Sequence, residues 1–239
     1  MKRETQNILL ILLGGALVKI AVNGDYLRYV KPAQQPWIVA GGAVMVLLGA
    51  VAIVRDLVAS RKAALEDHDG HSHSARPAWL LLVPVLAVFL VAPPALGADS
   101  VIRTEARAPS SAAVANAAAF PPLPAGNVVT LSVNEFVTRA GWDSAGTLNG
   151  RTVSLTGFVV HTEGSTLLAR LVISCCAADA FPVTVRLRGG EADHLASDAW
   201  IRVTGRIVPG TATKDNSYTP DFTPDSVTPV ATPKDPYEY

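Results

Sequence analysis

Three apolar runs occupy most of the first 97 residues of this 239-residue chain, and they constrain its fold more than any other feature. They lie at 7–22, 37–54 and 78–96; Lys19 is the one charged residue within the first, and the other two contain none. A helix needs about 20 mostly apolar residues to cross the hydrocarbon core of a bilayer, with a lower limit near 17. Lys19 can extend its ammonium group to the interface, which lengthens the first run in effect. The sequence therefore predicts a membrane region, 1–97, with three transmembrane helices.

The distribution of Lys and Arg predicts the orientation of these helices. Four basic residues lie in the loop at 55–77 and two precede the first run, whereas the connection at 23–36 contains only two. The positive-inside rule places the N-terminus and the 55–77 loop in the cytoplasm. Three crossings of the plasma membrane then leave the rest of the chain extracytoplasmic. Two alternatives remain: the first run is a signal peptide, or the chain is processed at the small residues of PPALGADS after the third.

Composition excludes several function classes. Only 17% of the residues are charged and the formal net charge is zero, whereas a soluble domain has about 25% charged residues. This composition favours the lipid bilayer as a partner, and the absence of a basic patch argues against nucleic acid. The chain also lacks G-x-S-x-G, Walker and HExxH motifs, so the sequence predicts a protein that is not an enzyme.

A short histidine-rich stretch, EDHDGHSHS at 66–74, lies in the predicted cytoplasmic loop. His68, His71 and His73 alternate with acidic residues, and neutral imidazole and carboxylate groups are good ligands for Zn²⁺. Such tracts bind weakly because their geometry is not fixed. The alternative is a solvated polar loop in which the histidines have no ligand.

The chain after residue 97 predicts a linker followed by a β domain. Ala, Ser and Pro dominate 98–127 without a regular period, which is typical of a linker. Ser132 stands three residues before Glu135, a capping-box pattern that predicts a helix at about 133–140, with Gly141 at its C-terminal end.

Four later segments alternate apolar and polar residues with period two, which predicts half-buried antiparallel strands. They are RTVSLTGFVVH (151–161), TLLARLVIS (166–174), PVTVRLR (182–188) and WIRVTGRIV (200–208). With VVTL (128–131) as a fifth strand, and with Gly157 and Gly205 where strands would coil sharply, we expect an all-β, OB-like small barrel across 128–239. A small open β-sandwich is the alternative. The Pro/Thr-rich tail, 209–239, keeps four aromatic residues, so part of it should pack on the barrel.

The segment ISCCAADA, 173–180, contains both cysteines of the chain. Adjacent Cα atoms lie about 3.8 Å apart, which is below the usual disulfide range of about 4.4–6.8 Å. A disulfide between Cys175 and Cys176 would therefore be strained and easily reduced, as a redox switch requires. In a further interpretation, Cys175 is simply a small core residue and Cys176 an incidental thiol.

Metal binding is the third interpretation of this pair. Neighbouring side chains of a straight strand face opposite ways, so both thiols can bind one ion only if the strand ends at Ser174 and the chain turns. Asp179 would then be a third ligand, and His161 or His194 a fourth. Two thiolates with oxygen or nitrogen ligands suit Zn²⁺ or Cu(I).

The phrase LVISCCAADAFPVTVRL, followed by LASDAWIRVTGRI and the closing PYEY, resembles the YcgQ-like family of bacterial membrane proteins. The resemblance implies N-terminal membrane spans, an outer domain with an I-x-C-C-A-A-D-A signature, and a YcgR-type membrane permease as partner. The signature corresponds here to Ile173 and to the run from Cys175 to Ala180. Of these residues, Cys175, Cys176 and Asp179 have side chains that can bind a metal. The resemblance carries no assigned activity, although association of such pairs with zinc homeostasis is one implication.

These observations lead to one function and two alternatives. We expect a non-enzymatic accessory subunit of a membrane permease that presents a metal ion, with zinc as the candidate cofactor, outside the membrane. His68, His71 and His73 would be a second, cytoplasmic contact for that ion. The alternatives are an extracytoplasmic thiol redox sensor or enzyme that uses the cysteine pair, and a membrane-anchored OB-like module that binds a partner protein.

Overall fold

In a computed structural model of the chain, the described residues are 3–63, 86, 90, 94–104 and 120–239. They belong to two compact units, Met1–Pro94 and Ala95–Tyr239. Most of the third predicted span, 78–96, lies outside the described residues, and His68, His71 and His73 lie outside them as well.

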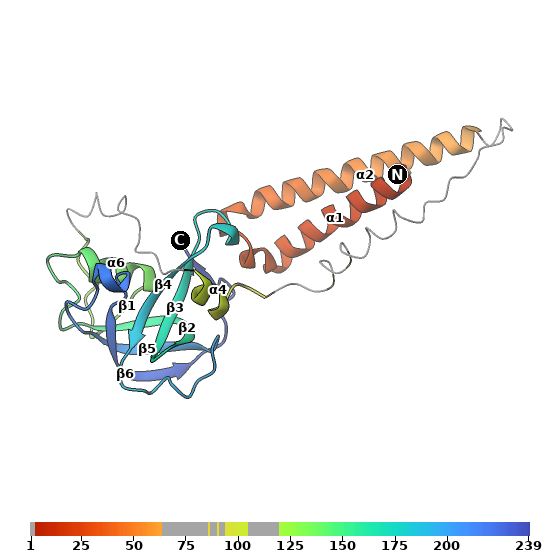
Figure 1. Ribbon diagram of the computed structural model, residues 1–239. Coiled ribbons are helices and arrows are strands. Elements are labelled where there is room, and N and C mark those ends of the chain that lie inside the picture. Colours follow the sequence, from red (N-terminus) through yellow and green to blue (C-terminus); the bar gives the residue numbers. More distant parts are fainter. Residues whose placement is uncertain (1–2, 64–85, 87–89, 91–93, 105–119) are drawn as a thin grey trace. The chain divides into compact units, whose positions relative to one another are not determined.

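The N-terminal unit contains two helices, α1 (Arg3–Asn23) and α2 (Gln35–Ala63), joined by the short 3-10 helices η1 (Asp25–Arg28) and η2 (Pro32–Gln34) (Figure 1). Both helices are long and apolar enough to cross a membrane, over Gln6–Asn23 and Pro32–Ala59. They contain the runs at 7–22 and 37–54 on which the first two spans were predicted. Helix α2 continues to Ala63, so the predicted 55–77 loop begins as helix.

Helices α1 and α2 pack closely because glycines meet at their contact. A Cβ atom on Gly14 would lie 2.6 Å from the carbonyl oxygen of Gly42, and one on Gly42 would lie 2.8 Å from that of Gly14. Such small residues let helix backbones approach each other. Each helix has one pair of adjacent glycines; Gly14 and Gly42 make this contact, whereas Cβ atoms on Gly15 and Gly41 would meet nothing within 4 Å.

The C-terminal unit is built on a seven-stranded mixed sheet (Figure 1). Its strands are β1 (Val128–Thr130), β2 (Thr152–Thr162), β3 (Ser165–Val172), β4 (Phe181–Leu187), β5 (Trp200–Ile207), β6 (Asp221–Pro229) and β7 (Tyr237–Glu238). Five of them pair in a ring: β2 with β5, β5 with β6, β6 with β4, β4 with β3, and β3 with β2. The pairs β4–β6, β1–β2 and β3–β7 are parallel, and the other four are antiparallel.

The four alternating segments correspond to β2, β3, β4 and β5, but the prediction of the fifth strand of the ring was wrong. The segment at 128–131 forms β1, which pairs with β2 alone, and the ring is completed by β6 from the Pro/Thr-rich tail. Pro224 and Pro229 obscured this strand in the sequence, because proline is unfavourable in most strand positions. A register shift in the β5–β6 pairing lies at Gly205, where a Cβ atom would be 2.1 Å from the carbonyl oxygen of Thr223.

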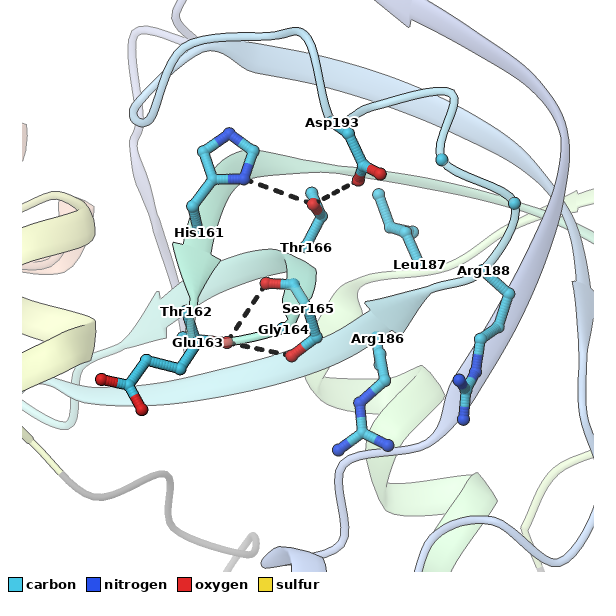
Figure 2. Close-up of a pocket in the computed structure, with 12 residues that line it drawn as sticks. His161, Thr162, Glu163, Gly164, Ser165, Thr166, Arg186, Leu187, Arg188 and Asp193 are labelled. Atoms are coloured by element: carbon cyan, nitrogen blue, oxygen red, sulfur yellow. Dashed lines mark hydrogen bonds between the residues drawn. The ribbon is translucent and has the colours of Figure 1, made fainter.

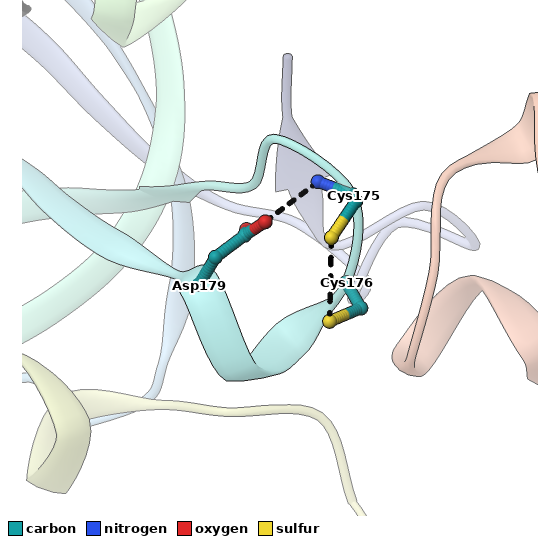
Figure 3. Close-up of side chains that lie close together, drawn as sticks. All are labelled: Cys175, Cys176 and Asp179. Atoms are coloured by element: carbon teal, nitrogen blue, oxygen red, sulfur yellow. Dashed lines mark hydrogen bonds between the residues drawn. The ribbon is translucent and has the colours of Figure 1, made fainter.

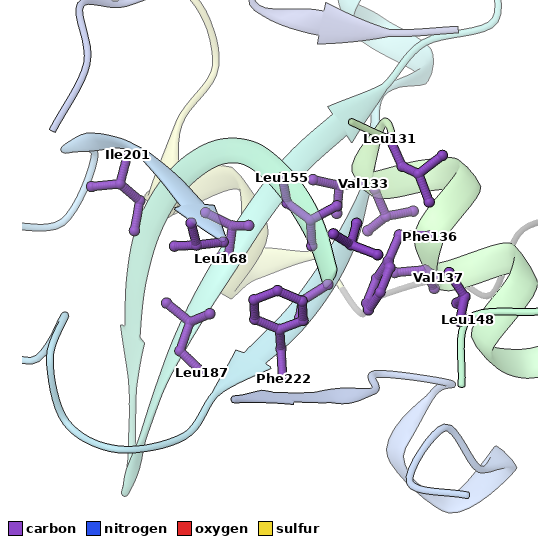
Figure 4. Close-up of a cluster of buried hydrophobic side chains, with 14 of the residues drawn as sticks. Leu131, Val133, Phe136, Val137, Leu148, Leu155, Leu168, Leu187, Ile201 and Phe222 are labelled. Carbon is purple, nitrogen blue, oxygen red and sulfur yellow. The ribbon is translucent and has the colours of Figure 1, made fainter. Parts of the chain in front are cut away.

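Strand β3 is buried on both faces rather than on one, because two hydrophobic clusters lie against it. Leu168 and Val172 belong to the larger cluster, where Phe136 packs edge-on against Phe222 at a centroid distance of 5.5 Å (Figure 4). Leu171 and Ile173 belong to the smaller cluster, together with residues of α4 and β7. The half-buried pattern predicted for this strand therefore does not hold.

Helices α4 (Ala98–Arg103) and α6 (Val133–Trp142) flank the sheet. Helix α6 confirms the predicted cap, because the Ser132 hydroxyl accepts a hydrogen bond from the backbone N–H of Glu135. Gly141 lies inside the helix rather than after it, and a Cβ atom there would be 3.1 Å from the Tyr218 ring. Helix α4 lies in the range predicted as a linker; its Ala98 and Val101 are buried in the smaller cluster.

Candidate thiol and carboxylate site

The CCAAD segment forms a turn directly after β3. The strand ends at Val172, and Ile173 still donates its N–H to the carbonyl oxygen of Glu238 in β7, at 3.0 Å. The chain then bends at Ser174 and enters a short 3-10 helix, η4 (Ala177–Asp179). The condition on which both thiols can share one ion, a turn at Ser174, is therefore met.

Asp179 holds the turn together. One of its carboxylate oxygens accepts the N–H of Ser174 and the other accepts the N–H of Cys175, both at 2.7 Å. The carboxylate thus lies beside Cys175, on the inner side of the turn, as Figure 3 shows. Because these bonds join residues at most five positions apart, the turn is defined by its own sequence.

The two cysteines are free thiols that lie on one side of the turn. Their sulfur atoms are 3.6 Å apart, with Cys175 exposed and Cys176 half-buried. A disulfide would require about 2.05 Å between the sulfurs. In a tetrahedral zinc site with Zn–S bonds of about 2.3 Å, two sulfurs lie about 3.8 Å apart. The observed spacing is therefore close to that of two thiolates on one metal ion.

The carboxylate controls the acidity of the neighbouring thiol. A hydrogen bond to Asp179 raises the pKa of Cys175 from 9.0 to about 11, with a further contribution from the Cys176 thiol. Burial opposes ionisation of Asp179, but hydrogen bonds from the Cys175 thiol and from the backbone N–H groups of Ser174, Cys175 and Cys176 together lower its pKa. Near neutral pH, Cys175 is therefore a protonated thiol beside an ionised carboxylate.

Cys175, Cys176 and Asp179 bring two sulfurs and a carboxylate oxygen within 4.8 Å of one another. Within the described part of the chain, this is the one group of three or more such side chains that could hold a metal ion. His161 and His194 do not join it, contrary to one expectation from the sequence. His161 contacts Thr166 and the carbonyl oxygen of Leu195, at the opposite end of β3, and His194 lines a separate cavity.

Glu238 fixes the position of β7, and sequence reasoning did not identify it. Its carboxylate accepts the N–H groups of Val133 and Asn134 at 2.9 and 2.7 Å, at the start of α6. It also pairs with the buried guanidinium of Arg170 at 3.4 Å. Burial raises the pKa of Glu238, although these hydrogen bonds and Arg170 oppose that shift. Since β7 binds Ile173 through the Glu238 carbonyl oxygen, this network holds the residue that precedes the turn.

Two family models cover most of the chain. Residues 142–239 match the DUF1980 C-terminal domain, and residues 5–105 match the DUF1980 N-terminal domain. The chain belongs to the DUF1980 family. The cysteine turn lies in the C-terminal DUF1980 domain, and both apolar helices lie in the N-terminal one. No curated protein and no solved structure matches this DUF1980 chain.

Proposed function

We propose that this DUF1980 protein is a membrane-anchored, non-enzymatic subunit that presents a thiophilic metal ion to a membrane permease. The ion would be held by Cys175, Cys176 and Asp179. The convergence of two sulfurs and a carboxylate oxygen within 4.8 Å carries the proposal. Two thiolates and one carboxylate leave a fourth tetrahedral position open, which a transfer partner can fill. Zn²⁺ and Cu(I) are the ions that this ligand set suits.

The same proposal includes the arrangement in the membrane. Helices α1 and α2, with the run at 78–96, would form three transmembrane spans in the plasma membrane. The N-terminus and the histidines at 68, 71 and 73 would be cytoplasmic, and the β domain extracytoplasmic. The basic residues of 55–77 support this orientation. The resemblance to the YcgQ-like family supports a YcgR-type permease as the partner.

We further propose that the ring of five strands is an OB-like barrel. Five strands that pair in a ring, with one parallel pair among them, have the strand pairing of this fold. In such a barrel the cysteine turn connects the second and third strands of the ring. A loop in that place is fixed at both ends by the barrel, which suits a site that must present an ion to another protein.

Metal content of the full chain in detergent tests the proposal. We expect the reduced protein to bind Zn²⁺ at the turn, and Cys175→Ser with Cys176→Ser to lower that affinity at least about a hundredfold. Replacing His68, His71 and His73 by Ala in both proteins removes any contribution of the histidine-rich stretch. Asp179→Asn, which removes the third proposed ligand, should also lower the affinity, and Asp225→Asn, at an exposed carboxylate on β6, is its matched control.

The metal half of the proposal can be contradicted separately from the subunit half. Equal zinc content in the doubly substituted and unsubstituted proteins, both without the three histidines, would exclude the turn as the metal site. Unchanged co-purification of the permease would then leave the subunit role standing. A reversible Cys175–Cys176 disulfide, detected by thiol blocking and mass spectrometry, would support the redox alternative instead. The raised pKa of Cys175 makes it a weak nucleophile near neutral pH. Because the thiolate is also the form that binds a metal, zinc binding must release the Cys175 proton.

A further inference from the structure

A second polar site lies at the opposite end of β3 from the cysteine turn. A cavity of about 720 Å³ opens between the β2–β3 hairpin, the end of β4 and the segment that follows β4 (Figure 2). Its lining combines arginines, hydroxyls and glycines: His161, Thr162, Glu163, Gly164, Ser165, Thr166, Arg186, Leu187, Arg188, Gly189, Gly190 and Asp193. No Phe, Tyr or Trp is among them, so the cavity lacks the flat rings on which bases stack.

Two arginines give one end of the cavity a positive charge. Arg186 and Arg188 are two residues apart at the end of β4, so their side chains extend to the same side, as Figure 2 shows. Both pair with one carboxylate, that of the buried Asp221. Two guanidinium groups exceed the Asp221 carboxylate by one positive charge at this end, whereas Asp193 and Glu163 bring negative charge to the rest of the lining. The Arg188 side chain remains 53% exposed, so its donors are accessible from the cavity.

The Nε–H of Arg186 is buried and has no hydrogen-bond partner among the described residues. Buried donors are nearly always paired in native proteins, because an unpaired one loses its hydration without compensation. This atom is closed to solvent, so a ligand in the cavity cannot reach it directly. The Arg186 side chain as a whole is 32% exposed, which leaves its terminal nitrogens as the donors that face the cavity.

Glycines expose the backbone next to the arginines. Gly189 and Gly190 have φ angles of +100° and +74°, a region that favours glycine. A Cβ atom on Gly189 would meet nothing within 4 Å, so open space borders the chain here. Glycine in such a conformation lets a ligand approach the peptide groups closely.

The opposite wall of the cavity is acidic but largely engaged within the protein. The Thr166 hydroxyl donates to Asp193, and His161 holds the neighbouring loop through the carbonyl oxygen of Leu195 at 2.7 Å. Glu163, at the exposed tip of the β2–β3 hairpin, is the remaining acidic group of the lining. Its negative charge opposes an anion in the cavity. Removing that charge should therefore strengthen the binding of an anion and weaken the binding of a cation.

We propose that this cavity binds a phosphate group, with Arg188 and Arg186 as its cationic donors. The guanidinium fork matches the spacing of phosphate oxygens and forms charge-assisted, bidentate hydrogen bonds. A tetrahedral phosphate has enough oxygens to contact both arginines and the glycine backbone together. The phosphate is either free or carried by a small ester such as a glycerol phosphate headgroup. The site is separate from the cysteine turn and does not depend on metal binding.

Calorimetric titration of the full chain in detergent with inorganic phosphate and with glycerol 3-phosphate, at constant ionic strength, tests this inference. We expect saturable binding of at least one of them, and a preference between the two identifies the source of the group. Arg188→Gln should weaken binding about tenfold or more, whereas Glu163→Gln should strengthen it about twofold. Arg202→Gln, an equivalent loss of charge at an exposed position on β5 outside the cavity, should leave the affinity unchanged.

Absence of saturable binding of both compounds by the unsubstituted protein would overturn the proposal. So would affinities that are equal in the unsubstituted, Arg188→Gln and Glu163→Gln proteins, because binding would then occur elsewhere. Glu163 is solvent-exposed, so we expect its variant to unfold at the temperature of the unsubstituted protein. Arg188 pairs with the buried Asp221, so the affinity of its variant is compared at a temperature at which thermal unfolding shows that the variant is folded.

Discussion

The two ends of strand β3 bear polar sites that are built in different ways. After Val172, the thiol turn is fixed by one carboxylate, Asp179, through contacts with residues no more than five positions away. Before Thr166, the cavity gathers a hairpin, the end of β4 and a loop, and its arginines pair with Asp221 more than thirty residues further along the chain. The first site is local and preformed by its own sequence, whereas the second exists only when the sheet is assembled.

The largest change expected is one that weakens the core beneath both sites. Phe222 is fully buried and packs edge-on against Phe136 in the larger cluster. Phe222→Ala should lower the free energy of unfolding by about 3–5 kcal/mol, because it removes a large buried ring and leaves a cavity. Denaturant unfolding of the full chain measures this, with the exposed Val128→Ala as the control. If the Phe222 and Val128 variants unfolded at the same denaturant concentration, β6 would not be part of the core.

Removing the Asp179 carboxylate should affect the thiol end alone. In Asp179→Asn the pKa of Cys175 should fall from about 11 towards 9.0, because the variant lacks the negative charge and one of the two accepting oxygens beside the protonated thiol. At pH 8 the thiolate fraction should rise roughly 10- to 100-fold. The rate of iodoacetamide alkylation at Cys175 against pH measures the shift. An alkylation profile identical to that of Asp225→Asn would contradict the role given to Asp179.

A smaller effect is expected at the cavity end from Thr166→Val. The buried Thr166 hydroxyl donates to Asp193 and contacts His161, so Thr166→Val removes both interactions, although the exposed Asp193 can bond to water instead. We expect a loss of stability of about 0.5–1.5 kcal/mol, with the zinc affinity of the turn unchanged. Thr223→Val, at an exposed position on β6, is the matched control. A lower zinc affinity in the Thr166 variant would show that the two ends of β3 are coupled.

Much of the fold could be predicted because its signals are periodic. The alternation in 151–161, 166–174, 182–188 and 200–208 located β2 to β5, and the capping box located the start of α6. Strand β6 was missed because its prolines and polar residues resemble a loop. Helix α4 was missed because its six residues are too few to show a period, and its burial in the smaller cluster depends on tertiary contacts.

The candidate sites likewise divide into features with a local sequence signal and features that depend on contacts between distant residues. The adjacent cysteines and the nearby aspartate are visible in eight consecutive residues. The sequence also showed that both thiols could bind one ion only if the chain turned at Ser174, and the structure has that turn. Glu238 could not be found, because its partners Arg170, Val133 and Asn134 lie 68 or more residues away in the chain. The sequence placed the cavity arginines on the polar face of a strand and no more. Their partner Asp221 and the facing hairpin are distant in the chain, so no nearby residue indicates them.

X-ray absorption at the zinc K-edge, on the full chain loaded with one equivalent of Zn²⁺, tests the central claim most directly. The account predicts two sulfur neighbours at about 2.3 Å and at least one oxygen or nitrogen neighbour at about 2.0–2.2 Å. The sulfur shell should disappear in Cys175→Ser with Cys176→Ser and persist when His68, His71 and His73 are replaced by Ala. A zinc shell of nitrogen and oxygen alone in the unsubstituted protein would contradict it.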